Sequence, residues 1–194
     1  ATIALTSAVG TNNQTVCINN PIVNITYAVG GSGTGGSVIG LPVGVTGVYA
    51  GGVVTISGTP TVSGSFPYTV STTGPCVIPT ATGTINVTAD ATIALTSVAG
   101  SDNQTLCINT PLLTNITYNV GGSGTGGIVA GLPTGITGVY AGGIVTISGT
   151  PIVSGVFNYT VNTTGGCPSG TASGRITVIS TPATAASAQT FCPI

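Results

Sequence analysis

The five cysteines offer the only covalent chemistry that this sequence could perform. They are spread along the whole chain, at Cys17, Cys76, Cys107, Cys167 and Cys192. No two of them have the close spacing of a zinc or redox motif, and the chain has no histidine, so a metal site is not expected. Disulfide bonds form and persist in oxidising compartments. If the cysteines pair, they therefore predict a location outside the cytosol.

The charged side chains are too few for catalysis. Only Asp90, Asp102 and Arg175 carry a charge, and the chain has no His, Glu or Lys. A general acid–base pair is therefore missing, and a serine or threonine nucleophile would lack an activating partner. Two isolated aspartates also fall short of the roughly six to eight oxygen ligands that calcium takes. We expect no enzymatic activity, no metal and no cofactor.

The same scarcity of charge excludes several partners. Nucleic acids and anionic membrane surfaces are bound through clusters of Lys and Arg, and this chain has one Arg. No stretch of about 20 residues is continuously apolar, as a membrane-spanning helix requires. The glycine-rich stretch "GGSGTGG" at residues 30–36 lacks the lysine and the following helix of a phosphate-binding loop. We expect it to form a bulged hairpin loop, and we expect neither a nucleic acid partner nor membrane insertion.

The elements that carry these residues are repeated. "ATIALTS" begins at Ala1 and again at Ala91, and "NITYAVGGSGTGG" at Asn24 returns as "NITYNVGGSGTGG" at Asn115. Of 87 aligned positions 62 are identical, so the chain contains two copies of one unit. The sequence predicts domains at 1–89 and 90–180, with residues 181–194 opening a third. We interpret the chain as a window from a longer array, in which truncation has removed the partner of Cys192.

Each copy reads as an all-β sandwich. Apolar residues alternate with Thr, Ser or Asn in "TIALTS", "NITYAV", "VVTIS", "FPYTV" and "GTINV", which is the pattern of half-buried strands. Glycine and proline punctuate these segments, and no helical periodicity is present. Six or seven short strands in about 90 residues favour tandem immunoglobulin-like β-sandwich domains. Pro67, inside one strand pattern, predicts an edge or bulge position.

The stretches "GLPVGVTGVYAGGVVTISGTP" at 40–60 and "GLPTGITGVYAGGIVTISGTP" at 131–151 carry a family resemblance. They resemble the signature of cadherin-like, He-PIG-type immunoglobulin-like modules over residues 24–88 and 115–179. The added Gln-Thr-x-Cys and Thr-Thr-Gly-x-Cys elements are similar to repeats of very large surface adhesins of Bacteroidota, including gliding-motility adhesins exported by the type IX system. The resemblance implies an extracellular, cell-surface stalk of tandem repeats. The calcium-binding pattern of cadherins is absent.

The cysteine pairing depends on the strand directions, which the sequence leaves open. If the strand that ends near Cys17 and the strand that ends near Cys76 run the same way, both cysteines reach one end of the sandwich. We then expect Cys17–Cys76 and Cys107–Cys167 within domains. The alternative joins neighbouring units, for example Cys17 with Cys167, and geometry must decide.

Three functions follow as hypotheses. The first is a structural stalk or filament module that holds an adhesive tip away from the cell, with neighbouring repeats as its partners. The second is a module that binds a glycan or surface, for which Tyr49 and Tyr140 in "TGVYAGG" are the candidate contacts, because the other tyrosines are expected in the core. The third is a subunit that self-assembles laterally into a homo-oligomer or fibre through strand edges that lack charged guards.

Overall fold

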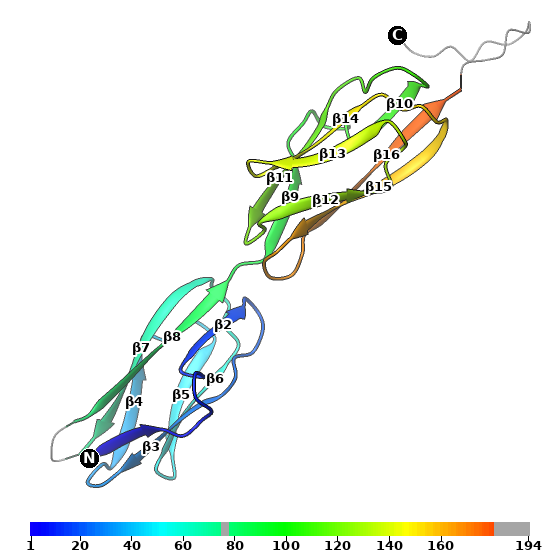
Figure 1. Ribbon diagram of the computed structural model, residues 1–194. Coiled ribbons are helices and arrows are strands. Elements are labelled where there is room, and N and C mark those ends of the chain that lie inside the picture. The colour runs from blue at the N-terminus through cyan, green and yellow to red at the C-terminus, as the bar shows by residue number, and fades with distance from the viewer. Residues whose placement is uncertain (75–77, 181–194) are drawn as a thin grey trace, which may run out of the picture. The chain divides into compact units, whose positions relative to one another are not determined.

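The computed structural model describes residues 1–74 and 78–180, and the chain folds as two compact units. Domain 1 takes in Ala1–Ala89, and domain 2 begins at Asp90. Within the described residues all regular structure is β-strand, without a helix (Figure 1). The third repeat expected at 181–194 lies outside the described residues, as do Cys76 and Cys192.

Domain 1 is a sandwich of two four-stranded sheets. Its described strands are β1 (Thr2–Leu5), β2 (Asn13–Cys17), β3 (Ile25–Gly30), β4 (Gly35–Ile39), β5 (Val45–Ala50), β6 (Val53–Gly58), β7 (Gly64–Thr73) and β8 (Thr80–Thr88). One sheet has the order β1-β3-β6-β5 and the other the order β2-β8-β7-β4. The pairing of β2 with β8 is parallel, and the other pairings are antiparallel.

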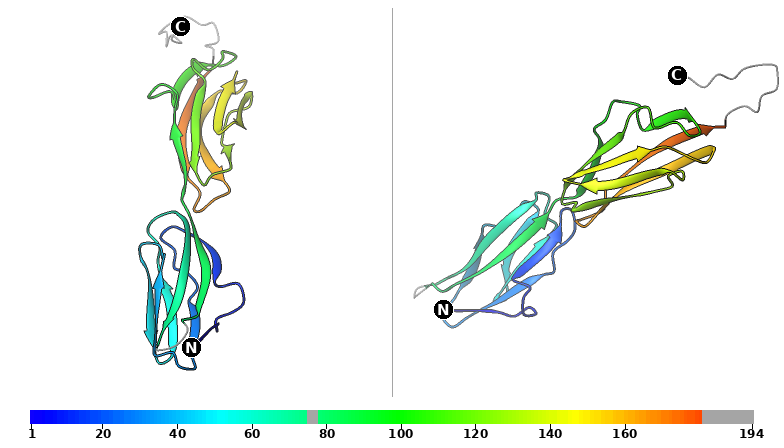
Figure 2. Two further views of the ribbon diagram at one scale, coloured as in Figure 1. Left: turned by 90° about the vertical axis from the view of Figure 1, so that its left-hand side faces the viewer. Right: turned by 45° about the horizontal axis from the view of Figure 1, so that its top comes forward.

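Domain 2 repeats this topology strand for strand. Its described strands are β9 (Ala91–Leu95), β10 (Asn103–Cys107), β11 (Ile116–Gly122), β12 (Gly126–Ala130), β13 (Ile136–Ala141), β14 (Ile144–Gly149), β15 (Gly155–Thr164) and β16 (Thr171–Ile179). The sheets have the orders β9-β11-β14-β13 and β10-β16-β15-β12, and β10 pairs with β16 in parallel. Figure 2 shows from two further directions how the strands follow the long dimension of each domain.

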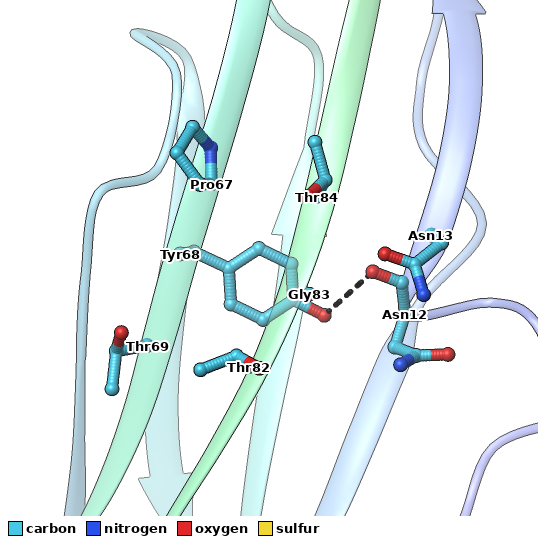
Figure 3. A pocket seen from close by; sticks show the side chains of 8 residues that line it. All are labelled: Asn12, Asn13, Pro67, Tyr68, Thr69, Thr82, Gly83 and Thr84. Carbon is cyan, nitrogen blue, oxygen red and sulfur yellow. Dashed lines mark hydrogen bonds between the residues drawn. The ribbon is translucent and has the colours of Figure 1, made fainter.

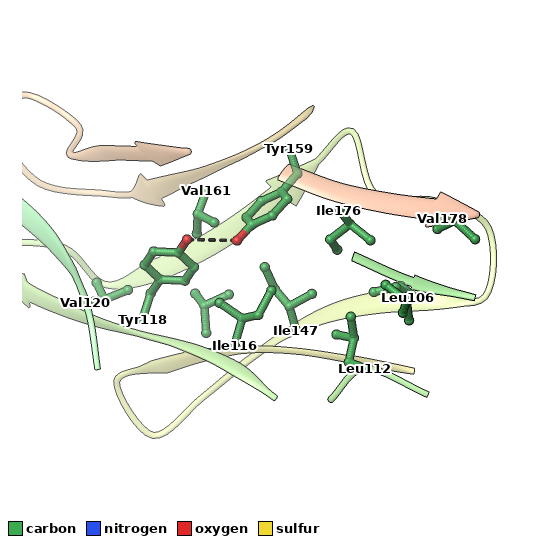
Figure 4. Packing of buried hydrophobic residues seen from close by; sticks show 12 residues of the cluster. Leu106, Leu112, Ile116, Tyr118, Val120, Ile147, Tyr159, Val161, Ile176 and Val178 are labelled. Carbon is green, nitrogen blue, oxygen red and sulfur yellow. Dashed lines mark hydrogen bonds between the residues drawn. The ribbon is translucent and has the colours of Figure 1, made fainter. Parts of the chain in front are cut away.

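The core of each domain lies between its two sheets, and alternation along the strands builds it. In β7 the side chains of Tyr68 and Val70 are buried, whereas the residues between and beside them face outward at least in part. In domain 2 the same alternation places residues of both sheets in the core, as Figure 4 shows for Tyr118, Tyr159 and their apolar neighbours. Because β-branched side chains pack well on a pleated surface, valine and isoleucine supply most of this core. The predicted immunoglobulin-like, all-β fold is confirmed.

Three details of the fold differ from expectation. Eight strands are described in each domain instead of six or seven, because β2, β4 and β5 have weak alternation. The "GGSGTGG" loop is not a hairpin, because β3 and β4 belong to different sheets and the loop crosses from one to the other. Pro67 was expected at an edge or a bulge, but it lies in β7, which is an inner strand of its sheet. The neighbouring strand β4 ends at Ile39, opposite Thr69, so Pro67 lies past the end of that strand.

Candidate functional site

A pair of tyrosines in the interior of each domain joins its two sheets through hydroxyl groups. Tyr27 comes from β3 and Tyr68 from β7, and their hydroxyl oxygens lie 3.0 Å apart. The Tyr68 hydroxyl also lies 3.2 Å from the carbonyl oxygen of Asn12, to which it can donate a hydrogen bond. In domain 2 Tyr118 and Tyr159 repeat the arrangement at 3.0 Å, and the Tyr159 hydroxyl bonds to the carbonyl of Asp102. Each tyrosine pair thus satisfies its own hydroxyl groups inside the sandwich.

A glycine makes room for this hydroxyl network. Gly83 faces Tyr68 across the β7–β8 pairing. A Cβ atom at Gly83 would overlap the carbonyl oxygen of Asn12 and the hydroxyl end of Tyr68. Gly174 has the same surroundings in domain 2, formed by Tyr159 and Asp102. The buried tyrosine therefore requires a glycine opposite it, and both repeats keep this tyrosine–glycine pair.

Burial favours the neutral form of the phenols of Tyr68, Tyr118 and Tyr159. Loss of contact with water raises the pKa of Tyr68 well above its ordinary value, and the hydrogen bond with Tyr27 raises it further. The pKa of Tyr159 is raised in the same way, first by burial and then by its bond to Tyr118. Burial also raises the pKa of Tyr118. A raised pKa disfavours the phenolate, so these hydroxyl groups remain hydrogen-bond donors within the fold.

A buried glutamine explains the Gln-Thr-x-Cys element. The side-chain amide of Gln104, only 7% exposed, donates to the carbonyl oxygens of Ser101 and Thr114, at 2.9 and 2.7 Å. Its side-chain oxygen accepts from the backbone N–H of Leu113 at 3.0 Å. Gln14 makes the equivalent bonds in domain 1. This glutamine fixes the loop after β10, and its place in a repeated motif was the signal available in the sequence.

A shallow polar groove lies beside Gly83 on one sheet of domain 1, and a corresponding groove lies beside Gly174 in domain 2. In domain 1 it is lined by Asn12, Asn13, Pro67, Tyr68, Thr69, Thr82, Gly83 and Thr84, as Figure 3 shows. In domain 2 the corresponding groove is lined by Asn103, Asn158, Ser173, Gly174 and Arg175. The linings differ, because Asn158 replaces Pro67 and Arg175 replaces Thr84. The two grooves therefore lie at corresponding places in the two domains but differ in charge and in hydrogen-bonding groups.

The two candidate contact tyrosines are only partly exposed. Tyr49 on β5 packs against the core of domain 1, with its ring close to Gly36, where a Cβ atom would lie 3.6 Å from the ring. Tyr140 on β13 packs in the same way beside Gly127 in domain 2. Much of each ring therefore serves packing, and the proposed contact role stays a prediction. The expected burial of Tyr27 and Tyr68 is confirmed.

Cys17, Cys107 and Cys167 are each disulfide-bonded. The expected Cys107–Cys167 pair is wrong, because the two residues lie at opposite ends of domain 2. Cys107 is opposite Ile179 at the end of β16, whereas Cys167 precedes Thr171 at its start. The eight residue steps of β16 between these ends span about 27 Å, and a disulfide needs Cα atoms within about 7 Å.

The physical reason is strand direction. Because β10 is parallel and β15 antiparallel to β16, the strands that lead to Cys107 and Cys167 run in opposite directions. In domain 1, β2 and β7 are opposed in the same way, so Cys17 lies at the end remote from Thr73 and Thr80. Cys76, its expected partner, lies outside the described residues.

Over residues 1–74 and 78–180, no group of three or more His, Cys, Asp or Glu side chains gathers as a metal site would require. None of the described segments is a helix long and apolar enough to cross a membrane. The features that stand out chemically are thus the tyrosine pairs, the glutamines and the disulfide-bonded cysteines.

Comparison with solved structures finds tandem immunoglobulin-like domains. An I-band fragment of titin, I67-I69, superposes with a TM-score of 0.57 at 10% identity, covering 87% of this chain and 62% of the fragment. The IG1+IG2 pair of DIP-gamma superposes with a TM-score of 0.51 at 10% identity, covering 92% and 97%. The chain thus spans 62% of the length of the titin fragment. No protein-family model and no curated protein matches the sequence. These likenesses show the fold.

Proposed function

We propose that this chain is a spacer segment of an extracellular, cell-surface adhesin, in which tandem immunoglobulin-like repeats hold a binding tip away from the cell. The support comes from what the two repeats keep and what they change. The proposal names the neighbouring repeats as the main partners of each domain, and it agrees with the resemblance to surface adhesins of Bacteroidota.

The observation that carries the proposal is the contrast between interior and surface. The fully buried Ile25, Tyr27, Val54, Ile56, Tyr68, Val70 and Ile85 recur as Ile116, Tyr118, Val145, Ile147, Tyr159, Val161 and Ile176. The groove beside Gly83 and Gly174, in contrast, differs between the repeats in its charge and its hydrogen-bonding groups. Repeats that keep their interiors and vary their grooves are typical of units that need only fold and connect.

The path of the chain through one domain also suits a spacer. In domain 1 the amino group of Ala1 donates to Ser32 at 2.9 Å, and a Cβ at Gly74 would meet the backbone of Ser32 and Gly33. The chain thus enters beside the end of β7 and leaves at Thr88, at the far end of β8. Because entry and exit lie at opposite ends, each added repeat adds length.

The test measures length against repeat number. Recombinant arrays of two, four and six copies would be imaged by negative-stain electron microscopy under non-reducing conditions. We expect end-to-end length to rise in proportion to the number of copies, and antibodies against the chain to label intact cells of the source organism. Compact particles of constant width would contradict the spacer role, and labelling only of permeabilised cells would contradict the location.

A second candidate function, lateral self-assembly, is favoured by apolar residues on edge strands. Ile39 on β4 is 69% exposed and Val48 on β5 is 59% exposed, and no charged side chain accompanies them on these strands. Unguarded edges can pair with another chain. Sedimentation of the two-repeat chain over a range of concentrations would reveal such association, and a glycan array would test the binding of sugars through the groove or through Tyr49 and Tyr140.

A further inference from the structure

We propose that domain 2 carries a binding site for acidic sugars, centred on Arg175, the only cationic side chain of the protein. The ligand class is a carboxylate borne on a hydroxylated ring, such as a uronic acid residue of a polysaccharide. The site gives this one repeat a binding activity of its own, which goes beyond the spacer role and does not depend on it.

Three polar residues of domain 2 lie in one row across three neighbouring strands. Asn103 of β10 and Asn158 of β15 both lie directly opposite Arg175 of β16. The residue that follows each of them along its strand is buried, so strand alternation turns the row to the face away from the core. All three residues are exposed, and they line one groove together with Ser173.

The polar groups of this row are not used up inside the domain. Within residues 1–74 and 78–180 the Arg175 side chain forms neither an ion pair nor a hydrogen bond, and the side chains of Asn103 and Asn158 form no hydrogen bond. The backbone N–H of Arg175 donates to the carbonyl of Asp102 at 2.8 Å, but the Asp102 carboxylate forms no ion pair with the guanidinium group. The guanidinium donors and both amides are therefore available to a ligand.

This set of groups matches a carboxylate on a sugar. A guanidinium group binds a carboxylate through two parallel, charge-assisted hydrogen bonds. Residues directly opposite one another on neighbouring strands lie about 5 Å apart, so an amide flanks the guanidinium on each side. An amide can both donate to and accept from a hydroxyl group, as a sugar requires.

The same groups disfavour other classes of ligand. Nucleic acid is bound through several phosphate contacts, and this row supplies one positive charge. The groove is lined by Asn103, Asn158, Ser173, Gly174 and Arg175, which offer no apolar side chain to a lipid tail or a hydrophobic peptide. The observations therefore favour a small, hydroxylated anion.

Domain 1 shows that the fold itself does not require the row. There Thr84 and Pro67 take the places of Arg175 and Asn158, and they lie opposite each other in the same register (Figure 3). Threonine has no charge and the proline side chain has no hydrogen-bonding group, so this groove lacks the groups that would hold a carboxylate. Because each set of residues occurs in one repeat of the same fold, exchanging the sets tests binding while leaving the core intact.

The single arginine makes a direct test possible. In the isotope-labelled chain its side-chain Nε–H gives one NMR signal, which reports on this site alone. We expect galacturonic acid, titrated at mildly acidic pH, to shift this signal and the side-chain amide signals of Asn103 and Asn158 until they saturate, with a dissociation constant on the order of 1 mM.

Two simpler probes separate the parts of the ligand. Acetate, which has the carboxylate without the hydroxyl groups, should bind about tenfold more weakly. Galactose, which has the hydroxyl groups without the carboxylate, should leave the arginine signal in place. Acetate binding as tightly as galacturonic acid, an equal response to galactose, or the lack of a saturable shift with galacturonic acid would overturn the proposal.

Exchange of residues between the repeats supplies the matched variants. In Arg175→Thr, which installs the domain 1 residue, we expect the amide signals of Asn103 and Asn158 to stop responding to galacturonic acid. In Pro67→Asn/Thr84→Arg, domain 1 gains the missing groups, and a second arginine signal should respond as the first does. Undiminished amide shifts in the first variant, or an unresponsive second arginine signal in the other, would overturn the row as the binding site.

Discussion

The hydroxyl groups of Tyr27 and Tyr68 lie 3.0 Å apart in the interior of domain 1, where one side chain from each sheet meets the other. A contact of this kind ties the packing of the two sheets to a hydrogen bond with defined geometry. Because domain 2 has the same pair, each effect predicted for one domain can be measured against the other in the same molecule.

Replacing Tyr68 by phenylalanine should destabilise domain 1. The change removes a hydroxyl that bonds to Tyr27 and to the carbonyl of Asn12, and it leaves those buried groups without that partner. We expect the free energy of unfolding of domain 1 to fall by about 1–3 kcal/mol. Urea unfolding of the whole chain would measure it, with Tyr49→Phe, at a partly exposed position, as the control. Equal effects of the two substitutions would contradict the role of the pair.

Adding one methyl group at Gly83 should be at least as damaging. A Cβ there would overlap the Asn12 carbonyl and the Tyr68 hydroxyl, neither of which can move without breaking the network. We expect Gly83→Ala to destabilise domain 1 by about 1–3 kcal/mol, as overpacking usually does. Gly174→Ala should do the same to domain 2. Thr82→Ala, on the exposed face of the same strand, serves as the control, and a Gly83→Ala variant as stable as this control would refute the steric argument.

A substitution in the glutamine motif should introduce a pH dependence. In Gln104→Glu a carboxylate would face the carbonyl oxygens of Ser101 and Thr114, to which it cannot donate. Burial and this repulsion would raise the pKa of the new carboxyl group, so the penalty is present at neutral pH and shrinks as the pH falls and the group gains a proton. We expect domain 2 to lose about 2–4 kcal/mol near pH 7.

Thermal unfolding at pH 4 and pH 7 would check this prediction. The matched variant is Gln14→Glu, whose side chain is less buried in domain 1, and its penalty should be smaller. A Gln104→Glu variant with the same stability at both pH values would show that the side chain turns out into water.

The buried phenols predict loss of stability in alkali. The pKa values of Tyr68, Tyr118 and Tyr159 are raised in the folded protein, whereas an unfolded tyrosine titrates near 10. Their contribution is therefore complete below about pH 10 and declines as the pH rises above it, because the unfolded chain then loses protons that the folded chain retains.

Spectrophotometric titration would show this directly through the absorbance of tyrosinate. We expect three or more of the six tyrosines to remain protonated until the sheets unfold, as followed by circular dichroism. Ionisation of all six near pH 10 with the sheets intact would contradict the burial argument.

The sequence predicted well those parts of the fold that local pattern determines. Alternation in "NITYAV" and "FPYTV" located β3 and β7 and their buried tyrosines, because the side chains of a strand alternate between two faces. It predicted β4 poorly, since glycines replace the apolar residues that would have marked it.

Strand direction could not be predicted from the sequence, for a different reason. The parallel partner of β2 is β8, some 70 residues later, and such a pairing depends on long-range packing that neither strand encodes alone. The error in the expected Cys107–Cys167 pair follows from this kind of unknown, since β10 is likewise parallel to β16. The glutamine contacts were hidden as well, because their partners are backbone atoms of a loop, which any sequence provides.

The parallel pairing of β2 with β8 has a mechanical consequence. The five residue pairs from Asn13–Thr84 to Cys17–Thr88 lie side by side along the direction in which the chain crosses the domain. A pull on the two ends of the domain therefore slides these strands past each other, so that their hydrogen bonds resist in shear and share the force. Had the strands been peeled apart from one end, the bonds would have opened one after another, each at a fraction of that force.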